Sequence, residues 1–423
     1  MKDVIKIGEQ DETNRNRTDV FTTALSPDSS KIVVFNQQPN AKQEGFSLAV
    51  YNADFTEIWS KNAKLPYKKS NFGVENYQID NNGNVYLLGI IYTEGSNRLE
   101  KHGKATYQYD IVAYRRDSIQ AEPKEYKIDL KDRFVSELSF KITNQGELLC
   151  AGFFSEKGAK SIKGSCFFKI NPTTSGMTTI NTREFDVDFM TANLSEKSKQ
   201  KAKQAVANND RANEPELFDY SIDHLIPRSD GGVIMVAEQY YIDERLRNTY
   251  ANNWGNPYYS VFNSAFNSPY SNFYDPYNRS NSNNRPDYYF NYNDIIVINI
   301  RPDGEIAWSA RIPKRQMSVN DGGINSSYAM SVVADKLYFI YNDDPKNLNA
   351  KQQKLNVETP DKYSVVTLAE VNKEGQVHRE PLFQNKDKGI VVRPKIGRQV
   401  GKRDMTIYGE SGRRYRFGVL SFE

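Results

Sequence analysis

Few residues in this chain have the types and spacing that catalysis or metal binding would require. The three histidines, His102, His224 and His378, lie far apart and share no metal-ligand spacing. No nucleophile elbow, zinc-protease helix, phosphate loop or dinucleotide-binding glycine pattern occurs. Turns such as 81–83 (Asn-Asn-Gly) lack the alternating oxygen ligands and the terminal Glu of a calcium loop. The sequence therefore indicates no catalytic residue, no metal and no cofactor.

Paired carboxylates are the one feature that would favour an enzyme, because two acids flanking a sugar can cleave a glycosidic bond. Candidate acids are Asp223, Glu238, Asp343 and Asp344, in a chain with 53 acidic residues. The Ser-x-Asp-x-Gly-x-x-Trp repeat of sialidase-type propellers is absent, and the nearest segment, PDGEIAW at 302–308, lacks the Ser. A carbohydrate-binding or glycan-cleaving protein remains the alternative to a non-enzymatic one.

The two cysteines, Cys150 and Cys166, fall in neighbouring predicted strands. If those strands form a hairpin that turns near 158–159, the two thiols face one another. They then form either a cross-strand disulfide or a pair of buried free thiols, since facing residues on adjacent strands often have poor disulfide geometry.

A long Tyr/Asn/Ser-rich insertion at about 250–293 is the most distinctive stretch of the sequence. Aromatic rings give large contact areas at low entropic cost, and Ser and Asn give adaptable hydrogen bonds, as in binding loops. Lys314 and Arg315 follow in the next loop. The candidate partner-binding residues are Tyr250, Trp254, Tyr258, Tyr259, Phe262, Phe266, Tyr270, Phe273, Tyr274, Tyr277, Lys314 and Arg315. The alternative is that these rings pack on the protein itself or form a low-complexity loop.

Charge and composition limit which classes of partner and which cellular compartments fit this chain. The 56 basic and 53 acidic residues give a net charge of +3, which offers no global field for nucleic acid. No apolar run reaches the length of a membrane-spanning helix, and the N-terminus lacks the apolar core of a signal peptide. The Asn/Tyr/Ser-rich composition favours an exported protein, periplasmic or secreted with its leader removed; the alternative is a cytoplasmic one.

The elements that must position these residues are short strands. Alternating β-branched and aromatic residues, interrupted by Asn-Gly and Asp-Gly turns, predict hairpins because such turns need positive φ. Four-strand units recur about every 50–60 residues along the 423-residue chain. That spacing is typical of a β-propeller. We therefore expect a single all-β domain over 1–423, with six blades or, alternatively, seven.

Two further features complete the predicted fold. The last unit supplies three strands, whereas VIKIG at 4–8 has no unit of its own, so we expect residues 4–8 to pair with 416–422 and close the ring. A helical linker at about 190–215 joins the third and fourth units. Within it, Ser195 is placed to cap a surface helix near 195–207.

The run from Asp230 to Asp344 carries a family resemblance. Its segments DGGVIMVAEQYY, NDIIVINIRPDGEIAWSARIPKRQ and DGGINSSYAMSVVADKLYFIYNDDPKN resemble uncharacterised exported β-propeller-like proteins of Bacteroidota. The resemblance implies a cell-envelope location and a non-catalytic, protein-binding or scaffold role. It also implies a context as an accessory subunit of the outer-membrane type 9 secretion and gliding apparatus. No functional residue of that family maps onto this chain.

Overall fold

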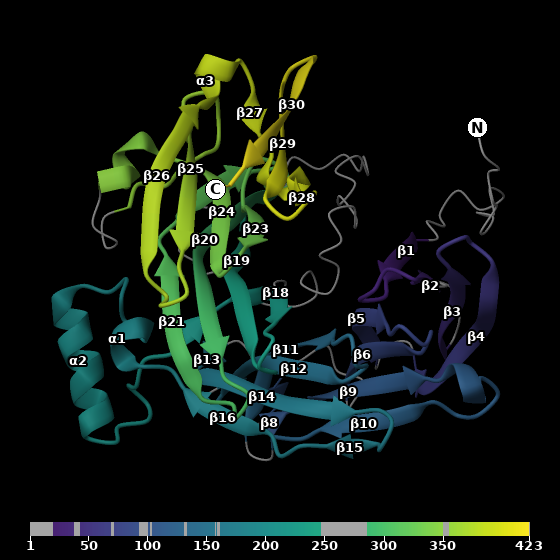
Figure 1. The fold of residues 1–423 in the computed structure, drawn as a ribbon. Coiled ribbons are helices and arrows are strands. Elements are labelled where there is room, and N and C mark those ends of the chain that lie inside the picture. The colour runs from purple at the N-terminus through teal and green to yellow at the C-terminus, as the bar shows by residue number, and fades with distance from the viewer. Residues whose placement is uncertain are drawn as a thin grey trace. The chain divides into compact units, whose positions relative to one another are not determined.

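The computed structural model describes ten stretches of the chain: 20–37, 43–68, 72–92, 100–101, 104–130, 133–156, 158, 161–246, 286–349 and 355–422. The chain divides into two compact units. The first unit comprises Met1–Arg183 and Leu225–Val233, and the second comprises Glu184–His224 and Ile234–Glu423. Each unit is described by itself below, and Figure 1 labels their elements.

Three antiparallel sheets build the first unit, each formed by strands that are close in sequence. The strands of the first sheet are β1 (Val20–Leu25), β2 (Lys31–Gln37), β3 (Gln43–Asn52) and β4 (Glu57–Lys68). Those of the second are β5 (Phe72–Ile79), β6 (Val85–Tyr92), β9 (Tyr107–Tyr114) and β10 (Lys124–Ile128). Those of the third are β11 (Phe134–Ile142), β12 (Leu148–Ser155), β14 (Gly164–Asn171), β15 (Gly176–Met177) and β16 (Asn181–Glu184). The remaining short elements are β7 (Glu100–Lys101), β8 (Lys104–Ala105), η2 (Arg116–Ser118) and β13 (Ser161–Ile162).

The second unit contains three more antiparallel sheets and the helices. Its first sheet holds β18 (Tyr220–Pro227), β19 (Val233–Leu246), β20 (Pro286–Ile300), β21 (Ile306–Ile312) and β22 (Gln316–Val319), of which Leu225–Pro227 and Val233 are assigned to the first unit. The next holds β23 (Ala329–Val333), β24 (Lys336–Asp343), β25 (Val365–Val371) and β26 (Val377–Gln384). The last holds β27 (Val391–Val392), β28 (Arg398–Gln399), β29 (Asp404–Ser411) and β30 (Arg414–Ser421). The other elements are α1 (Val187–Met190), α2 (Glu196–Ala207), β17 (Leu217–Phe218), η4 (Pro345–Asn349), α3 (Asn385–Lys388) and η6 (Pro394–Ile396).

The described part of the chain is mostly β, as the sequence predicts. Sheets of four or five antiparallel strands follow one another along the chain, an arrangement consistent with a β-propeller. The surface helix is also confirmed: Ser195 accepts a hydrogen bond from the Ser198 N–H and caps α2. The insertion is shorter than expected, because β20 begins at Pro286 and residues 286–293 are part of a strand.

Apolar side chains hold the sheets of the first unit. One buried cluster joins β6, β9, β11, β12 and β14 and includes Phe140, Leu148 and Phe168, each at most 1% exposed. A second cluster joins β2–β6 and β9 around Phe35, Phe46 and other buried residues. Both patterns follow from strands with two buried faces, whose sequences read as nearly continuous apolar runs.

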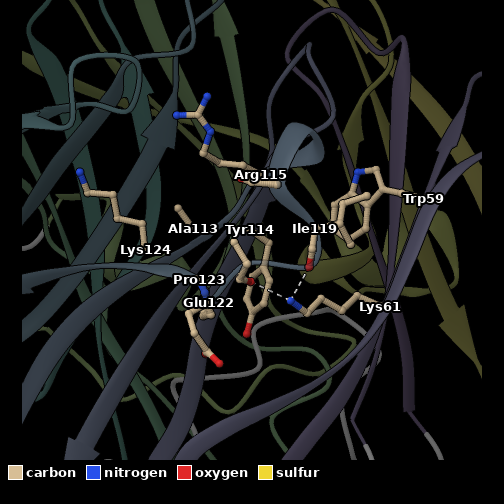
Figure 2. Close-up of a pocket in the computed structure, with 11 residues that line it drawn as sticks. Trp59, Lys61, Ala113, Tyr114, Arg115, Ile119, Glu122, Pro123 and Lys124 are labelled. Atoms are coloured by element: carbon tan, nitrogen blue, oxygen red, sulfur yellow. Dashed lines mark hydrogen bonds between the residues drawn. The ribbon is translucent and has the colours of Figure 1, made fainter.

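The turn between β5 and β6 shows why its sequence is Asp-Asn-Asn-Gly. The Asp80 carboxylate accepts hydrogen bonds from the Asn82 and Asn84 N–H groups, and Gly83 adopts a φ of +86°. The Gly83 carbonyl then accepts a 2.9 Å bond from the Trp59 indole on β4. On the same strand, the Lys61 ammonium donates to the carbonyls of the segment between β9 and β10 (Figure 2). These bonds tie the first sheet to the second.

Cys150 and Cys166 are free thiols, and both are buried. The expectation that they face one another is wrong by two residues. Cys150 pairs with Phe168, and Cys166 pairs with Gly152, because the segment that joins β12 and β14 spans 156–163 and sets a different register. The pair of buried free thiols is the alternative that the structure supports.

Strand β30 forms an edge of the last sheet. It pairs with β29, and no other described strand lies along its second edge. Its side chains Tyr415, Phe417 and Val419 are 68%, 71% and 65% exposed. Residues 4–8, which the sequence predicts to pair here, lie outside the described residues.

Candidate partner-binding site at the insertion stem

Two long strands carry the insertion. β19 has 14 residues and β20 has 15, and they are neighbours in their sheet. We call residues 239–246 and 286–293, their outer halves, the insertion stem. The inner half of β20, IIVINI, pairs with β21, whereas its outer half, from Tyr289 to Tyr292, pairs with β22. One continuous strand therefore runs from the apolar core to the base of the insertion.

Tyr292 is the anchor of the stem. Its ring packs on that of Tyr240 from β19, with 4.6 Å between the centroids. The Lys395 ammonium donates a 2.6 Å hydrogen bond to the Tyr292 hydroxyl and lies 4.1 Å from the ring centroid. Gly323, with a φ of +64°, makes room for this ring, since a Cβ at that position would lie 2.3 Å from it. The Tyr240 contact thus joins the two strands of the stem, and the contacts to Gly323 and Lys395 fix the stem to two other segments.

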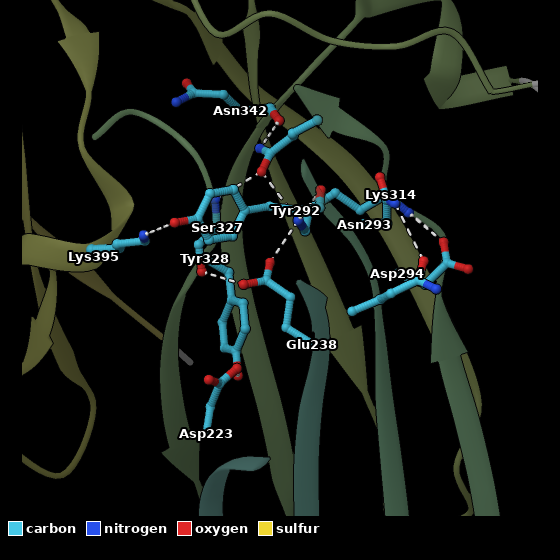
Figure 3. A network of polar contacts seen from close by, with 12 residues as sticks. Asp223, Glu238, Tyr292, Asn293, Asp294, Lys314, Ser327, Tyr328, Asn342 and Lys395 are labelled. Carbon is cyan, nitrogen blue, oxygen red and sulfur yellow. Dashed lines mark hydrogen bonds and ion pairs between the residues drawn. The ribbon is translucent and has the colours of Figure 1, made fainter. Parts of the chain in front are cut away.

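Lys314 lies beneath the stem and is fully buried, with a side chain 0% exposed. Its ammonium forms a 2.6 Å ion pair with Glu238 and donates to the Tyr292 carbonyl at 2.9 Å (Figure 3). Glu238 also accepts a 2.6 Å bond from the Ser327 hydroxyl. A buried ion pair needs further hydrogen bonds to offset the cost of desolvation, and here Lys314 also donates to Tyr292 and Glu238 also accepts from Ser327. Lys314 therefore supports the stem from within, and a partner could not reach it without opening this network.

Asp294 fixes the point where the stem joins the core. It accepts a hydrogen bond from the Lys314 N–H at 3.1 Å and one from Arg311 at 3.1 Å. The Arg311 and Asp294 side chains are each only 5% exposed. Arg311 also donates to the Tyr220 hydroxyl and the Phe189 carbonyl. The base of the stem is therefore tied to β18 and α1.

A chain of side-chain amides continues the network into the next two sheets. The Gln316 amide donates to the Asn342 carbonyl at 2.7 Å, and its oxygen accepts from the Ser327 N–H at 2.7 Å. The Asn342 amide donates to the Val392 carbonyl at 2.9 Å and accepts from Asn385 at 3.0 Å. These amides connect β22, β24 and the segment before β27.

Asp223 and Lys395 give the network its titratable groups. Burial, and then the charge of Glu238, raises the pKa of Asp223 to about 7. Its carboxylate accepts a 2.7 Å bond from the Tyr328 hydroxyl. Burial lowers the pKa of Lys395 to about 8. Both side chains are half-buried, so solvent reaches them, and each can exchange a proton near neutral pH.

The other acids that the sequence offered for glycan cleavage do not form a free pair. Glu238 is committed to Lys314 and Ser327. Asp343 is fully buried and accepts a 2.7 Å bond from the Asn347 amide, and burial raises its pKa to about 6. Asp344 accepts a bond from the Lys346 N–H. In the described part of the chain, no group of three or more His, Cys, Asp or Glu residues could hold a metal ion.

The predicted partner-binding residues divide into three groups. The ten aromatic residues from Tyr250 to Tyr277 lie outside the described residues. Lys314 is buried in the network, as described above. Arg315 is exposed and directly precedes β22, and its carbonyl accepts a 2.8 Å bond from the Glu358 N–H.

Sequence reasoning missed Tyr292, Asp294 and Lys395 as parts of one site. One signal was available in the sequence. Glu238 lies within the apolar strand MVAEQYY, and Asp294 lies at the start of the apolar strand NDIIVINI. A charged side chain in such a strand needs a partner. The identity of that partner, Lys314 or Arg311, was not readable from spacing.

No protein-family model and no curated protein sequence matches the chain. Among solved structures, the chain is similar to an acylaminoacyl peptidase at 9% identity and a TM-score of 0.37; the match covers 84% of this chain and 39% of the peptidase. The chain thus spans well under half the length of that enzyme.

Two of the similar structures are β-propeller domains. The Nup133 propeller of Vanderwaltozyma polyspora matches at 9% identity and a TM-score of 0.40, covering 95% of this chain and 83% of that domain. The propeller domain of the Trilobed protease from Pyrococcus furiosus matches at 8% identity and a TM-score of 0.29, covering 95% and 92%. None of the helices in the described residues is long and apolar enough to cross a membrane.

Proposed function

We propose that this chain is a non-enzymatic β-propeller that binds a protein partner through the aromatic insertion. The observation that carries the proposal is the anchoring of the insertion stem by the buried Glu238–Lys314 pair and the Lys395–Tyr292 bond. A preorganised stem limits the entropy lost when a loop engages a partner. Burial of the acids in protein contacts, Glu238 above all, argues against their use on a substrate.

The proposed setting is the bacterial cell envelope. The chain would act on the periplasmic side or after secretion, as a scaffold or accessory subunit of an outer-membrane secretion system. Support comes from the resemblance of Asp230–Asp344 to exported proteins and from the composition.

The experiment compares three forms of the protein in pull-downs from envelope extracts. The forms are the full chain, a variant with residues 247–285 replaced by a short Gly-Ser linker, and a variant whose ten predicted aromatic residues are changed to Ser. We expect both variants to lose a partner that the full chain captures. Both should keep the thermal unfolding midpoint, since the stem is untouched. Equal recovery of every partner by all three forms contradicts the proposal.

A carbohydrate-active protein is the second candidate, and Asp223 is the observation that favours it. A carboxyl with a pKa of about 7 beside a second carboxylate, Glu238, has the electrostatics of a general acid. Hydrolysis of chromogenic glycosides by the full chain, lost in Asp223→Asn, would select this function over the first.

For the fold, we propose six blades closed by residues 4–8 pairing with 416–422, a segment that includes most of β30. The second edge of β30, along which no strand of the described residues lies, and the exposed Tyr415 and Phe417 side chains support this pairing. Ile5→Asp with Ile7→Asp should lower the unfolding midpoint strongly, whereas Lys2→Ser with Gln10→Ser should not. An unchanged midpoint in the first variant contradicts closure.

A further inference from the structure

A small pocket in the first unit lies where Lys61 of β4 meets the segment between β9 and β10. Its volume is about 80 Å³, and it is lined by residues of β4, the end of β9, the segment that follows and the start of β10 (Figure 2). That volume is about half of the roughly 150 Å³ cavity that holds a benzene ring. The pocket therefore suits the end of one side chain or a very small molecule, and excludes a sugar ring or a nucleotide.

Lys61 supplies the charge of the pocket. Its ammonium donates to the Ile119 carbonyl at 2.6 Å and to the Ala121 carbonyl at 3.2 Å. It also lies 5.6 Å from the centroid of the Tyr114 ring. An ammonium has three donors, and two of them are used by neutral carbonyls. In the described part of the chain, no carboxylate forms an ion pair with Lys61, so its third donor is available to a ligand.

Two aromatic residues form the walls. Trp59 and Tyr114 both line the pocket and are 5% and 4% exposed. The Trp59 indole N–H is already bonded to Gly83, which leaves its ring as an apolar wall. Burial, and then the charge of Glu122, raises the pKa of Tyr114, so its hydroxyl keeps its proton at neutral pH.

The remaining charges leave the pocket weakly positive. Arg115 is neutralised by a bidentate contact with Asp117 at 3.0 and 2.7 Å. Lys124 faces the Tyr126 ring, 5.0 Å from its centroid. Glu122 is the one acid among the lining residues. Lys61 and Lys124 against Glu122 leave a net charge of about +1.

We propose that this pocket binds a carboxylate. The carboxylate would accept the third donor of Lys61, and its short alkyl stem would lie between Trp59 and Tyr114. The carboxylate can belong to a small carboxylic acid or to an acidic or C-terminal residue of a protein. The site is independent of the insertion, and its test does not involve residues 247–285.

The test is ligand-observed NMR titration of the full chain. The probes are sodium propionate, propionamide, an acetylated glutamate, and one short peptide prepared with a free and with an amidated C-terminus. We expect the carboxylates to bind and the two amides to bind at least tenfold more weakly. Tight binding of propionate alone indicates a small-molecule site, and preference for the free peptide terminus indicates a protein site. Equal binding of propionate and propionamide overturns the proposal, as does no saturation by any probe.

Four variants locate the site. Lys61→Met should weaken binding at least tenfold, and Lys61→Arg should retain most of it. Ala121→Phe should block the exposed rim while leaving the backbone carbonyl that holds Lys61. Lys402→Met, which removes an exposed lysine of the second unit, should change nothing. Unaltered propionate binding in both Lys61→Met and Ala121→Phe overturns the assignment.

Discussion

The two compact units differ in the interactions that hold their interiors together. In the first, aromatic and aliphatic clusters around Phe140 and Phe35 fill the space between sheets. In the second, an apolar cluster around Ile340 and Met405 is accompanied by the buried ion pairs of Lys314 and Arg311.

That difference reflects what each unit must position. Apolar burial is non-directional and suits the stacking of regular sheets. Hydrogen bonds and ion pairs impose distances and angles, so they fix irregular features such as a strand that changes partner and carries an insertion. The buried polar groups of the second unit therefore lie where side chains and strands must be held at defined distances and angles.

The largest expected effect comes from breaking the buried ion pair. Lys314→Met should lower the free energy of unfolding by about 3–5 kcal/mol, because it leaves the Glu238 carboxylate buried without its cation. The double variant Lys314→Met with Glu238→Met should recover most of that loss. Denaturant unfolding measures both. A double variant as unstable as the single one would show that packing, and not charge, dominates here.

A cavity in the first unit should lower the free energy of unfolding somewhat less, and the loss should not depend on pH. Leu148 is fully buried in the cluster around Phe140, so Leu148→Ala should cost about 3 kcal/mol. The loss should be the same at pH 5 and pH 7.5, because no charge is involved. A loss that varies with pH would contradict the contrast drawn between the units.

Removing the titratable acid should change how stability depends on pH. The folded-state pKa of Asp223, about 7, lies above its ordinary value, so the folded state binds the extra proton and wild-type stability falls as pH rises through this range. The charged and titratable groups coupled to it are Glu238, Lys314, Lys395 and Tyr328. Between pH 5 and 7.5, wild type should lose about 2 kcal/mol more than Asp223→Asn. Parallel pH profiles for the two proteins would contradict this.

The smallest expected loss of stability comes from removing one hydroxyl of the insertion stem. Tyr292→Phe removes the hydroxyl that accepts the Lys395 bond and should cost about 1 kcal/mol. Hydrogen exchange should accelerate in residues 286–293 of the stem and stay unchanged in the first unit. Tyr408→Phe, which removes a bond to Glu410 at the surface, serves as the matched control.

The repeating strand pattern was sufficient to predict the β architecture and the capped helix at 196–207, because alternation and turn residues are local signals. It placed the start of β20 eight residues late, because the segment 286–293 has the composition of a loop and is a strand through its pairing with β19 and β22. Lys314 was expected at the surface for the same reason. A charged residue after Pro313 is typical of an exposed loop, and its burial depends on Glu238, 76 residues earlier in the chain.

The two buried thiols offer a use of their own. Burial raises the pKa of both Cys150 and Cys166, so at neutral pH almost no thiolate forms while the protein is folded. Both sit on central strands of one sheet, β12 and β14, and a reagent reaches them only when that sheet opens. The rate at which a thiol reagent modifies the native protein therefore measures how often this sheet of the first unit opens, and the measurement needs no added label.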